Sequence, residues 1–466
     1  MAERFDLVVV GMGSAGVVAT EFAASLGLGV CAVERDRVGG DCLWTGCVPS
    51  KALLAAARAA HAMRTADRFG LAPVEPAIDT ARVLARVRAV QEQIASSDDD
   101  PDRFRAMGVN VRVGEPARLE GPHHVRVGAD VIEARFVLLC PGSRPAVPPI
   151  DGLGEAGFVT SETLWDLERL PASALLVGGG PIAVELAQAL RRLGSEVTIL
   201  GRAGRLLVRD EPELAERLAA VLRAEGVRIE LGVAPDRASL AGDRKALHAG
   251  ERSWTGEEIV VAVGRRTAVE GLGLDAIGVA PGASGTIEVD DRSRTRASSV
   301  YAVGDATGGE QFTHAAAADA ARAVRDMFFP GRGRSRAIVP WCTFTDPELA
   351  HAGLTSAEAR ARRGAGDVEV HTIELAHSDR ARAEAAAEGA LVAVTRKGRL
   401  VGAHLLAPAA GEVVGELTLA IEHGLKLADL ASVVHVYPTV ATSVAQLSAR
   451  AAFGRARRYR RLIRGV

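Results

Sequence analysis

The sequence predicts an α/β fold in which two strand–glycine turn–helix–strand units follow one another. The first unit starts with the apolar run 6–10, continues through a glycine turn and an alanine-rich helix, and ends at a second apolar run, 30–33. The same order returns about 170 residues later, over 174–200. Parallel strands joined in this way are typical of dinucleotide-binding βαβ units. Residues 336–466 alternate strand-like and helical segments without a third glycine turn, which predicts a separate α+β domain.

Composition limits the classes of function. With 466 residues, the chain is long enough for about three domains. A net charge of −2 and 4% aromatic residues argue against nucleic-acid binding through overall charge or base stacking. No apolar run is long enough to span a membrane and the N-terminus does not resemble a signal peptide, so we expect a cytoplasmic protein. Five cysteines are too few, and odd in number, for a disulfide scaffold, so a persistent pair should be catalytic.

The first glycine turn has the spacing G-x-G-x-x-G directly after the run 6–10. Gly11 permits the tight turn, Gly13 lets the backbone approach a pyrophosphate, and Gly16 lets the helix pack close to the strand. The free N–H groups at the start of the helix suit a phosphate. Glu34 ends the next strand, where an acid accepts hydrogen bonds from a ribose. A turn without a ligand is the alternative, but strand, helix and acid together favour a dinucleotide.

The second glycine turn has alanine in the third position, which this fingerprint tolerates. It consists of Gly178, Gly180 and Ala183. The strand that follows ends at Gly201, and the next polar residues are Arg202 and Arg205 instead of an acid. Arginine suits a ribose 2′-phosphate and a carboxylate suits a 2′-hydroxyl, so we expect NADPH in preference to NADH. Solvated arginines are the alternative, because arginine is the common cation of this chain. Two dinucleotide sites suggest one bound flavin and one exchangeable nicotinamide.

Two cysteines lie five residues apart in the segment 39–51, which reads Gly-Gly-Asp-Cys-Leu-Trp-Thr-Gly-Cys-Val-Pro-Ser-Lys. Pro49 suits a first helical turn, which places Cys47 at a helix N-terminus and Lys51 one turn further on. Both features lower the pKa of a thiol. A zinc half-site or two buried cysteines are the alternatives, but no further ligands lie near in sequence. We therefore expect Cys42 and Cys47 to form a redox pair and expect no bound metal.

Further segments match the motifs of one family. They are 139–145 with Gly142, Gly264–Arg265, 301–305 with Gly304 and Asp305, and 344–348. With the glycine turns and the cysteine segment, they make the chain similar over essentially its whole length to the flavin-dependent pyridine nucleotide–disulfide oxidoreductases. That family includes glutathione reductase, dihydrolipoamide dehydrogenase and mercuric reductase. Cys140 and Pro141 depart from its usual turn, and the usual Pro-Asn after Arg265 is absent.

The resemblance implies a division of the chain and a small-molecule substrate. We expect the following segments: an FAD-binding domain in 1–148, an NAD(P)-binding domain in 149–266, a second FAD-binding or central part in 267–335, and a dimerisation domain in 336–466. The family forms homodimers, so Tyr437 is expected to reach the active site of the partner. Binding to nucleic acid or to a membrane is not expected.

The resemblance also implies a mechanism. NADPH would give hydride to FAD, and the reduced flavin would pass electrons to a Cys42–Cys47 disulfide. Cys47 would be the flavin-side thiolate and Cys42 the thiol that attacks the substrate. Lys51 would lie near the flavin N5 atom and pair with Glu185, while Asp305 would contact the ribityl or pyrophosphate part of FAD. The cofactor-binding turns matched in the family motifs contain Gly142, Gly264 and Gly304.

One motif of the family is altered. Its C-terminal His-Pro-Thr-x-x-Glu supplies an acid–base histidine and the glutamate that orients it. Here Tyr437 stands in place of the histidine and Thr442 in place of the glutamate. Tyrosine has an ordinary pKa of about 10, so it is a poor proton acceptor at neutral pH. His435 could serve by a shifted geometry, although a packed or surface histidine is the preferred interpretation.

This altered motif keeps other functions open. Mercuric reductases carry tyrosine at the same place, but the tail 455–466 lacks the cysteine pair with which they pass the metal inward. We therefore expect reduction of a thiol or disulfide substrate. The alternative is a diaphorase-like reductase of quinones, dyes or metal ions of the mercuric type. A non-catalytic redox sensor is a third class, against which the intact segment 39–51 argues.

Overall fold

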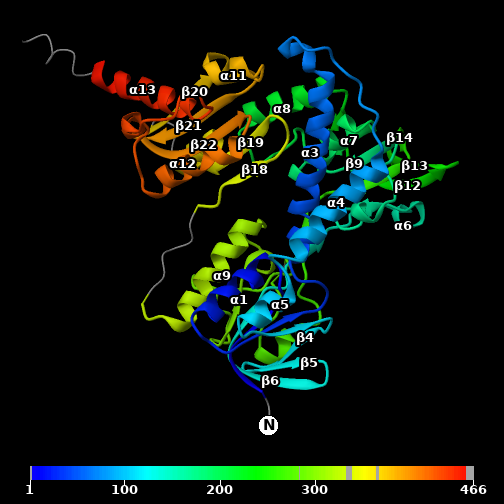
Figure 1. Ribbon diagram of the computed structural model, residues 1–466, viewed down its shortest axis with the longest axis vertical. Coiled ribbons are helices and arrows are strands. Elements are labelled where there is room, and N and C mark those ends of the chain that lie inside the picture. Colours follow the sequence, from blue (N-terminus) through cyan, green and yellow to red (C-terminus); the bar gives the residue numbers. More distant parts are fainter. Residues whose placement is uncertain (1–2, 283, 332–337, 364–366, 458–466) are drawn as a thin grey trace, which may run out of the picture.

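The computed structural model describes residues 3–282, 284–331, 338–363 and 367–457. Figure 1 shows an N-terminal body below, a second α/β body above it on the right and a C-terminal body above it on the left. This arrangement confirms the predicted α/β fold with two strand–turn–helix units and a C-terminal α+β domain. In the described residues, no helix combines the length and the apolar character that crossing a membrane requires.

The N-terminal body is built on a mixed sheet. Its elements in the first part of the chain are β1 (Arg4–Val10), α1 (Ser14–Ser25), β2 (Val30–Glu34), α2 (Gly40–Trp44), α3 (Cys47–Arg64), η1 (Ala66–Phe69), α4 (Thr80–Ala95), α5 (Pro101–Ala106), β3 (Asn110–Val113), β4 (Ala117–Gly121), β5 (His124–Val127), β6 (Asp130–Leu139) and β7 (Ser143–Pro145). The chain returns to it with β16 (Arg265–Thr267), η3 (Leu274–Ile277), β17 (Val300–Ala302), η4 (Gly304–Thr307) and α9 (Thr313–Phe328).

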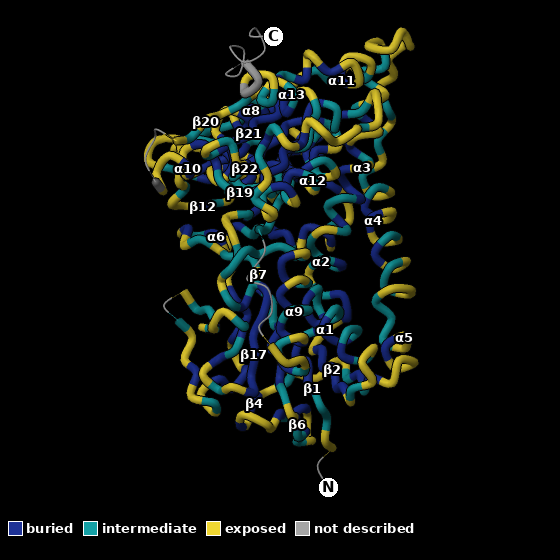
Figure 2. The backbone as a smooth tube through the Cα atoms, turned by 90° about the vertical axis from the view of Figure 1, so that its left-hand side faces the viewer, coloured by how far each residue is buried: buried dark blue, intermediate teal, exposed yellow. Residues whose placement is uncertain are grey.

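The order of strands in this sheet is β3-β2-β1-β6-β5-β4, with β17 beside β6. Strand β1 pairs in parallel with β2 and β6, so that Val9 lies opposite Ala32 on one side and Leu138 on the other. The strand is an uninterrupted apolar run because both of its faces are covered. Helices α1 and α9 pack on one face, and Figure 2 shows the buried backbone concentrated in these central strands.

The second body repeats the parallel pattern. Its elements are α6 (Leu153–Ala156), β8 (Val159–Thr160), η2 (Leu164–Asp166), β9 (Ser173–Val177), α7 (Pro181–Arg192), β10 (Glu196–Gly201), α8 (Pro212–Ala224), β11 (Arg228–Leu231), β12 (Arg237–Ala241), β13 (Arg244–Ala249), β14 (Arg252–Gly256) and β15 (Glu258–Val261). The sheet order is β11-β10-β9-β15-β8, and all of these neighbours are parallel. Helix α7 has a fully buried face, and the long helix α3 packs against it.

The C-terminal body is an antiparallel sheet with helices. Its elements are β18 (Trp341–Thr343), β19 (Glu348–Gly353), α10 (Ser356–Arg363), β20 (Val368–Glu374), η6 (Leu375–His377), α11 (Asp379–Ala383), β21 (Ala390–Arg396), β22 (Arg399–Ala407), α12 (Ala410–Glu422), η7 (Leu427–Ser432) and α13 (Thr442–Arg457). The strands are ordered β18-β19-β22-β21-β20, and α12 packs on β19 and β22.

The chain passes between the first two bodies at a small two-stranded sheet. Strand β7 leaves the N-terminal body, and β16 returns to it and pairs antiparallel with β7, with Arg265 opposite Pro145. The expected boundary after residue 148 lies shortly beyond β7, the one after residue 266 lies within β16, and the one after residue 335 lies outside the described residues. All three stay predictions.

A buried arginine joins the second and third bodies. The Arg192 side chain on α7 is only 5% exposed. Its guanidinium donates to both carboxylate oxygens of Glu225, at 2.9 and 2.7 Å, and to Asp346 Oδ2 at 2.8 Å. A buried charge is tolerated because these paired hydrogen bonds replace its hydration. The connection fixes the C-terminal body against α7.

We predict that Arg192→Ala destabilises the protein by about 3–5 kcal/mol, because Glu225 loses its partner in a buried environment. Urea unfolding followed by circular dichroism measures the change. Arg223 on α8 provides the matched control, since its ion pair with Glu216 is exposed. Arg223→Ala should cost less than about 1 kcal/mol. An equal loss in the two variants would contradict a structural role for Arg192.

Candidate active site

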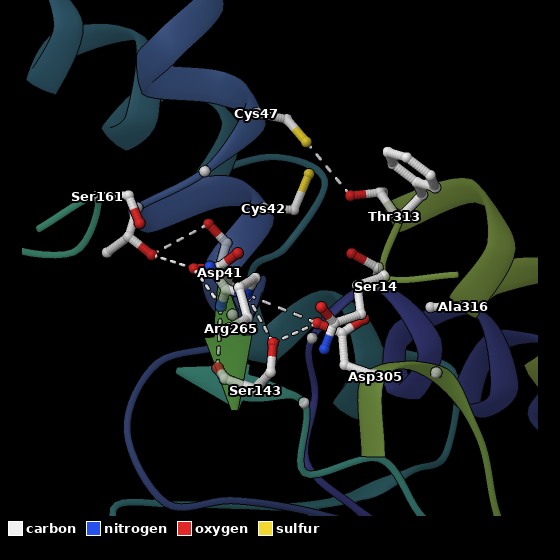
Figure 3. Close-up of a pocket in the computed structure, with 18 of the residues that line it drawn as sticks. Ser14, Asp41, Cys42, Cys47, Ser143, Ser161, Arg265, Asp305, Thr313 and Ala316 are labelled. Carbon is white, nitrogen blue, oxygen red and sulfur yellow. Dashed lines mark hydrogen bonds and ion pairs between the residues drawn. The ribbon is translucent and has the colours of Figure 1, made fainter. Parts of the chain in front are cut away.

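One cavity of about 1240 Å³ lies where the three bodies meet. Its walls include both glycine turns, the segment with the two cysteines, the start of α9 and the first strand of the C-terminal body. Pockets for small ligands measure about 300–1,000 Å³, so this cavity has room for larger ligands such as dinucleotides. Figure 3 shows Cys42 and Cys47 at the top of one part of the cavity, with Thr313 facing them.

The first glycine turn has no room for side chains. Gly11 has a φ of +94°, and a Cβ there would lie 2.3 Å from the carbonyl oxygen of Cys140. A Cβ at Gly16 would lie 1.8 Å from the carbonyl oxygen of Gly11. Helix α1 begins after Gly13 without a side-chain cap, so its first N–H groups are available to a phosphate. This cradle fits the pyrophosphate of a dinucleotide, as predicted from the spacing.

Glu34 is placed for a ribose beside that turn. Its carboxylate is buried at the cavity wall and accepts hydrogen bonds from the backbone N–H groups of Met12 at 2.7 Å and Asp36 at 2.9 Å. The two bonds orient the carboxylate but use only part of its capacity as an acceptor. The remaining lone pairs can accept from ribose hydroxyls.

The second glycine turn has the same construction. Gly178 has a φ of +137°, and a Cβ there would lie 2.2 Å from the carbonyl oxygen of Ala262. Gly180 precedes α7 without a side-chain cap, and Pro181 occupies the first turn, where its missing N–H costs nothing. Gly180 lines the cavity, while Ala183 is buried against the sheet. The start of α7 therefore offers a second phosphate site on the same cavity.

The two arginines after β10 differ in their surroundings. Arg202 is exposed. Arg205 instead donates to the backbone carbonyls of Leu207 at 2.9 Å, Val208 at 2.6 Å and Asp210 at 3.2 Å. These hydrogen bonds hold the loop 205–210 together, and they engage the guanidinium that was expected to bind a 2′-phosphate. These contacts speak against a phosphate-binding role for Arg205, whereas Arg202 is exposed to solvent and its expected role stays a prediction.

The two cysteines come together as predicted. Cys42 lies in the short helix α2, and Cys47 is the first residue of α3. Both are free thiols whose sulfur atoms face each other in Figure 3. The Thr313 hydroxyl lies 3.3 Å from the Cys47 sulfur. No motif indicated Thr313, because its position at the start of α9 is far from either cysteine in the chain.

The surroundings separate the acidities of the two thiols. A hydrogen bond from Cys42 lowers the pKa of Cys47 to about 6, with smaller contributions from Thr313 and the Lys51 charge. The same hydrogen bond, together with burial, raises the pKa of Cys42. A single thiolate on Cys47 is therefore the favoured state at neutral pH. The pair shares one proton, which stays on Cys42.

The remaining cysteines have no such activation. Burial raises the pKa of Cys31 to about 12 and also raises the pKa of Cys140 and Cys342. These thiols stay protonated at neutral pH, which agrees with the structural roles expected for buried cysteines.

Lys51 and Glu185 form the ion pair that the resemblance implied. The Lys51 ammonium lies 2.8 Å from Glu185 Oε2, one helical turn after Cys47. The Glu185 side chain is 7% exposed and the Lys51 side chain is 37% exposed. Phe344 contacts both: its backbone N–H donates to Glu185 Oε1 at 2.9 Å, and its ring centroid lies 4.3 Å from the ammonium.

Asp305 lies in a network of polar groups on the cavity wall. The Ser143 hydroxyl donates to its carboxylate, and Arg265 lies 3.8 Å away. Burial raises the pKa of Asp305. Arg265 also bonds to Ser143 Oγ at 2.6 Å and reaches Asp41, the neighbour of Cys42, at 3.2 Å. This network joins α2, β7 and β16 below the cysteines, as Figure 3 shows.

The three glycines of the family motifs lie in turns around the network of Asp305, Ser143 and Arg265. Their backbone takes positive φ angles of +69° at Gly142, +123° at Gly264 and +68° at Gly304. All three line the cavity. A side chain at these positions would strain the backbone, so the glycines shape the cavity wall.

Tyr437 and His435 lie away from this cavity, on an exposed segment of the C-terminal body. Tyr437 is 67% exposed and donates a hydrogen bond to Asp379, which raises its pKa. The His435 side chain is only 6% exposed. Its Nε2 atom lies 3.0 Å from Glu416 Oε1, and its Nδ1 atom lies 3.2 Å from the Val433 carbonyl.

These contacts favour the preferred interpretation of His435 as a packed histidine over the alternative of a catalytic role. Both of its ring nitrogens have partners in the same body, so the imidazole serves to hold its segment in place. The sequence pattern could not reveal the partner Glu416, which lies on α12. Tyr437 stays available to a second molecule.

Comparisons with known proteins identify the family of the chain. Residues 5–320 match the family model described as pyridine nucleotide-disulphide oxidoreductase, and residues 339–448 match its dimerisation domain. A mercuric reductase of Streptomyces lividans is 34% identical over 455 residues, with 94% of each chain covered. A dihydrolipoyl dehydrogenase of Halobacterium salinarum is 32% identical over 460 residues, with 96% of each covered.

Two solved structures have the same fold. The Cu(II) complex of the HOCl-induced flavoprotein disulfide reductase RclA from Escherichia coli has a TM-score of 0.85 and 29% identity, covering 95% of this chain and 99% of that one. LpdA from Mycobacterium tuberculosis has a TM-score of 0.88 and 25% identity, covering 96% and 99%. The chain therefore belongs to the pyridine nucleotide–disulphide oxidoreductase family and carries its dimerisation domain.

We predict that Cys47 reacts as a thiolate far below the ordinary thiol pKa. In reduced Cys42→Ser protein, the serine hydroxyl can still donate to Cys47. Alkylation of Cys47 by iodoacetamide should then stay fast at pH 7 and fall as the pH drops through about 6, because a lowered pKa keeps the thiolate until that point. Mass spectrometry of the alkylated peptide gives the profile.

Two controls accompany this profile. In Cys47→Ser protein, Cys42 should react only at alkaline pH, and Cys31 should stay unlabelled in every folded variant because it is buried. Thr313→Val removes one hydrogen bond to the thiolate and should move the Cys47 inflection upward. An inflection for Cys47 near 8.5, the value of a free thiol, would refute the assignment.

Proposed function

We propose that this family member is an FAD-dependent NAD(P)H oxidoreductase whose Cys42–Cys47 pair passes electrons to a thiol or disulfide substrate. The observation that carries the proposal is that both sulfur atoms, both glycine turns and the Lys51–Glu185 ion pair border one cavity. When bound, FAD and the nicotinamide supply the hydride and electron-transfer chemistry, for which proteins use cofactors. The side chains bind these groups, orient them and hold protons.

The polar groups of the cavity support this assignment. The uncapped start of α1 suits the FAD pyrophosphate, and Glu34 suits the adenosine ribose. Arg265 lies beside the Asp305 carboxylate. Its positive charge therefore reduces the repulsion between that carboxylate and the phosphates that the cavity must accept. The start of α7 suits the nicotinamide dinucleotide, and Arg202 directly follows β10, the strand after α7 in the chain. The Arg202 position favours NADPH over NADH.

The two thiols can reduce a disulfide by exchange. The Cys42 sulfur, once deprotonated, attacks one substrate sulfur and forms a mixed disulfide, and the first product thiol leaves. The Cys47 thiolate then attacks Cys42, the intramolecular disulfide forms, and the second thiol leaves. The two product thiols need two protons: one comes from Cys42 and the other from outside the pair. Thr313 and Lys51 support the Cys47 thiolate throughout.

We propose further that the chain works as a homodimer through its dimerisation domain, with Tyr437 facing the cavity of the partner. The exposure of Tyr437 and of the neighbouring Val434 and Val436 supports this arrangement, because exposed apolar groups favour association. Asp379 would hold the phenol in position from the same chain.

A metal ion is the second candidate acceptor. Two observations favour it: the acid–base histidine of the family is replaced by Tyr437, and the relatives include a mercuric reductase and a structure of a Cu(II) complex. A vicinal dithiol is a strong ligand for soft ions, and reducing such an ion needs no proton on a leaving group. Among the described residues, no group of three or more His, Cys, Asp or Glu side chains forms a metal site, so the ion would be a substrate.

Cysteine variants test the proposal and separate the acceptors. Anaerobic NADPH should bleach the flavin of the wild-type holoprotein and produce a long-wavelength absorption band from the Cys47 thiolate. Cys42→Ser and Cys47→Ser should keep NADPH-dependent flavin reduction but lose turnover of low-molecular-weight disulfides to background. Retained disulfide turnover in both variants would refute the dithiol mechanism.

The same holoproteins are then assayed with Hg(II), Cu(II) and a quinone. Loss of metal-ion turnover in both cysteine variants, with no disulfide turnover in the wild type, would favour the metal ion as acceptor. Quinone turnover that survives in a Cys42/Cys47 double variant would instead show that electrons leave without the dithiol.

We predict that Arg202→Ala weakens NADPH binding roughly 10- to 100-fold, since a hydrogen bond to a charged phosphate contributes about 1.5–3 kcal/mol. NADH lacks the 2′-phosphate and should lose less than about 2-fold in affinity. Quenching of protein fluorescence measures both dissociation constants. Equal losses for the two nucleotides would show that Arg202 acts on the loop and not on the phosphate.

A further inference from the structure

A residue of the C-terminal body contacts the ion pair of the cavity. Phe344 follows β18 and lies between Lys51 and Glu185, which come from α3 and α7. Its backbone N–H fixes one Glu185 oxygen at 2.9 Å, and the other oxygen accepts from the Lys51 ammonium at 2.8 Å. The ring of Phe344 faces that ammonium at 4.3 Å. One residue thereby sets the position of both charged groups.

The backbone around Phe344 is held by the same helix. Gln188 exchanges two hydrogen bonds with the backbone of Asp346: its Nε2 donates to the carbonyl at 2.8 Å, and its Oε1 accepts from the N–H at 2.8 Å. Arg192 binds the Asp346 carboxylate at 2.8 Å. Residues 185, 188 and 192 share one face of α7, because they are three and four positions apart. This face of α7 therefore determines the position of Phe344.

We propose that Phe344 is a positioning residue for the Lys51–Glu185 pair and, through it, for electron entry. The proposal rests on the proposed function, in which FAD binds in the cavity that this pair borders. Lysine has a flexible stem, so a lysine whose side chain is 37% exposed needs a second contact besides Glu185 to keep its ammonium in one orientation. The negative face of the aromatic ring supplies that contact. The C-terminal body thus contributes to the wall of the cavity beside the Lys51–Glu185 pair of its own chain.

A simple packing role for Phe344 makes a different prediction. Its side chain is only half-buried and lines the cavity, so an apolar residue of similar size would fill the same space. Leucine and methionine keep this apolar contact but lack the ring quadrupole. Tyrosine keeps the ring and its face. The three substitutions therefore separate packing from the contact with the ammonium.

The scarcity of lysine gives a direct readout. The chain has four lysines, Lys51, Lys245, Lys397 and Lys426. Amine acetylation needs the uncharged amine, so a contact that favours the ammonium slows the labelling. The holoprotein is treated briefly with an N-hydroxysuccinimide acetate at fixed pH, and the labelling rate of each lysine is followed by mass spectrometry. The other three lysines report reagent activity and global unfolding in the same sample.

We expect Phe344→Leu to raise the labelling rate of Lys51 roughly 2- to 30-fold, the range that a cation–π contact corresponds to. Phe344→Met should give the same result, and it replaces the leucine variant if that one does not fold. Phe344→Tyr should stay near the wild-type rate. The rates at the other three lysines should not change. An unchanged Lys51 rate in Phe344→Leu, or equal rates in the leucine and tyrosine variants, would overturn the proposal.

Flavin reduction by NADPH in the same proteins links this result to function. We expect slower reduction in Phe344→Leu than in Phe344→Tyr, with unchanged flavin content. A wild-type protein that binds no flavin would refute the proposed function, while the labelling experiment would still decide the role of Phe344. Altered labelling with equal rates of flavin reduction would refute the effect on electron entry.

Discussion

One face of helix α7 holds the site together. The start of this helix, after Gly180, offers uncapped N–H groups to a dinucleotide phosphate. Its side chains at Glu185, Gln188 and Arg192 bind Lys51 and the loop around Asp346. Because a helix is rigid over three turns, the phosphate cradle and the ion pair keep a fixed spacing. The cavity between the three bodies depends on this one element.

The charge state of the cysteine pair depends on a different set of contacts. Cys47 opens α3, where the helix dipole favours a negative charge, and Thr313 and Lys51 add hydrogen bonding and charge. Cys42 shares its proton with that thiolate. Helices α2 and α3, which follow one another in the chain, and α9, which lies about 250 residues further on, therefore supply one charge state.

The sequence was a good guide wherever the chemistry is local. The glycine spacings predicted both phosphate cradles because a tight turn and a close backbone approach need glycine at set positions, as at Gly11 and Gly178. The cysteine segment predicted a pair at a helix start for the same reason. The apolar runs predicted the central strands, since a strand covered on both faces has no polar alternation.

Contacts between distant segments could not be predicted in this way. Arg205 looked like a phosphate ligand, yet three carbonyls of its own loop occupy it. His435 was expected to be a packed or surface histidine, and it contacts Glu416, a partner that the sequence pattern did not indicate. The ring of Phe344 over Lys51 follows from the packing of the C-terminal body on α7, which no spacing reports.

The number of protons that the reaction consumes connects these findings to the choice of electron acceptor. A disulfide substrate is released as two thiols. These thiols need two protons, of which Cys42 holds one. The family motif supplies the other through a histidine, whereas this chain presents Tyr437, whose hydrogen bond to Asp379 raises its pKa and makes it a weaker acid. Reduction of a thiolate-bound metal ion needs no such donor. The same dithiol would therefore suit both proposed acceptors, but only the reduction of a disulfide would be slowed by the exchange of histidine for tyrosine.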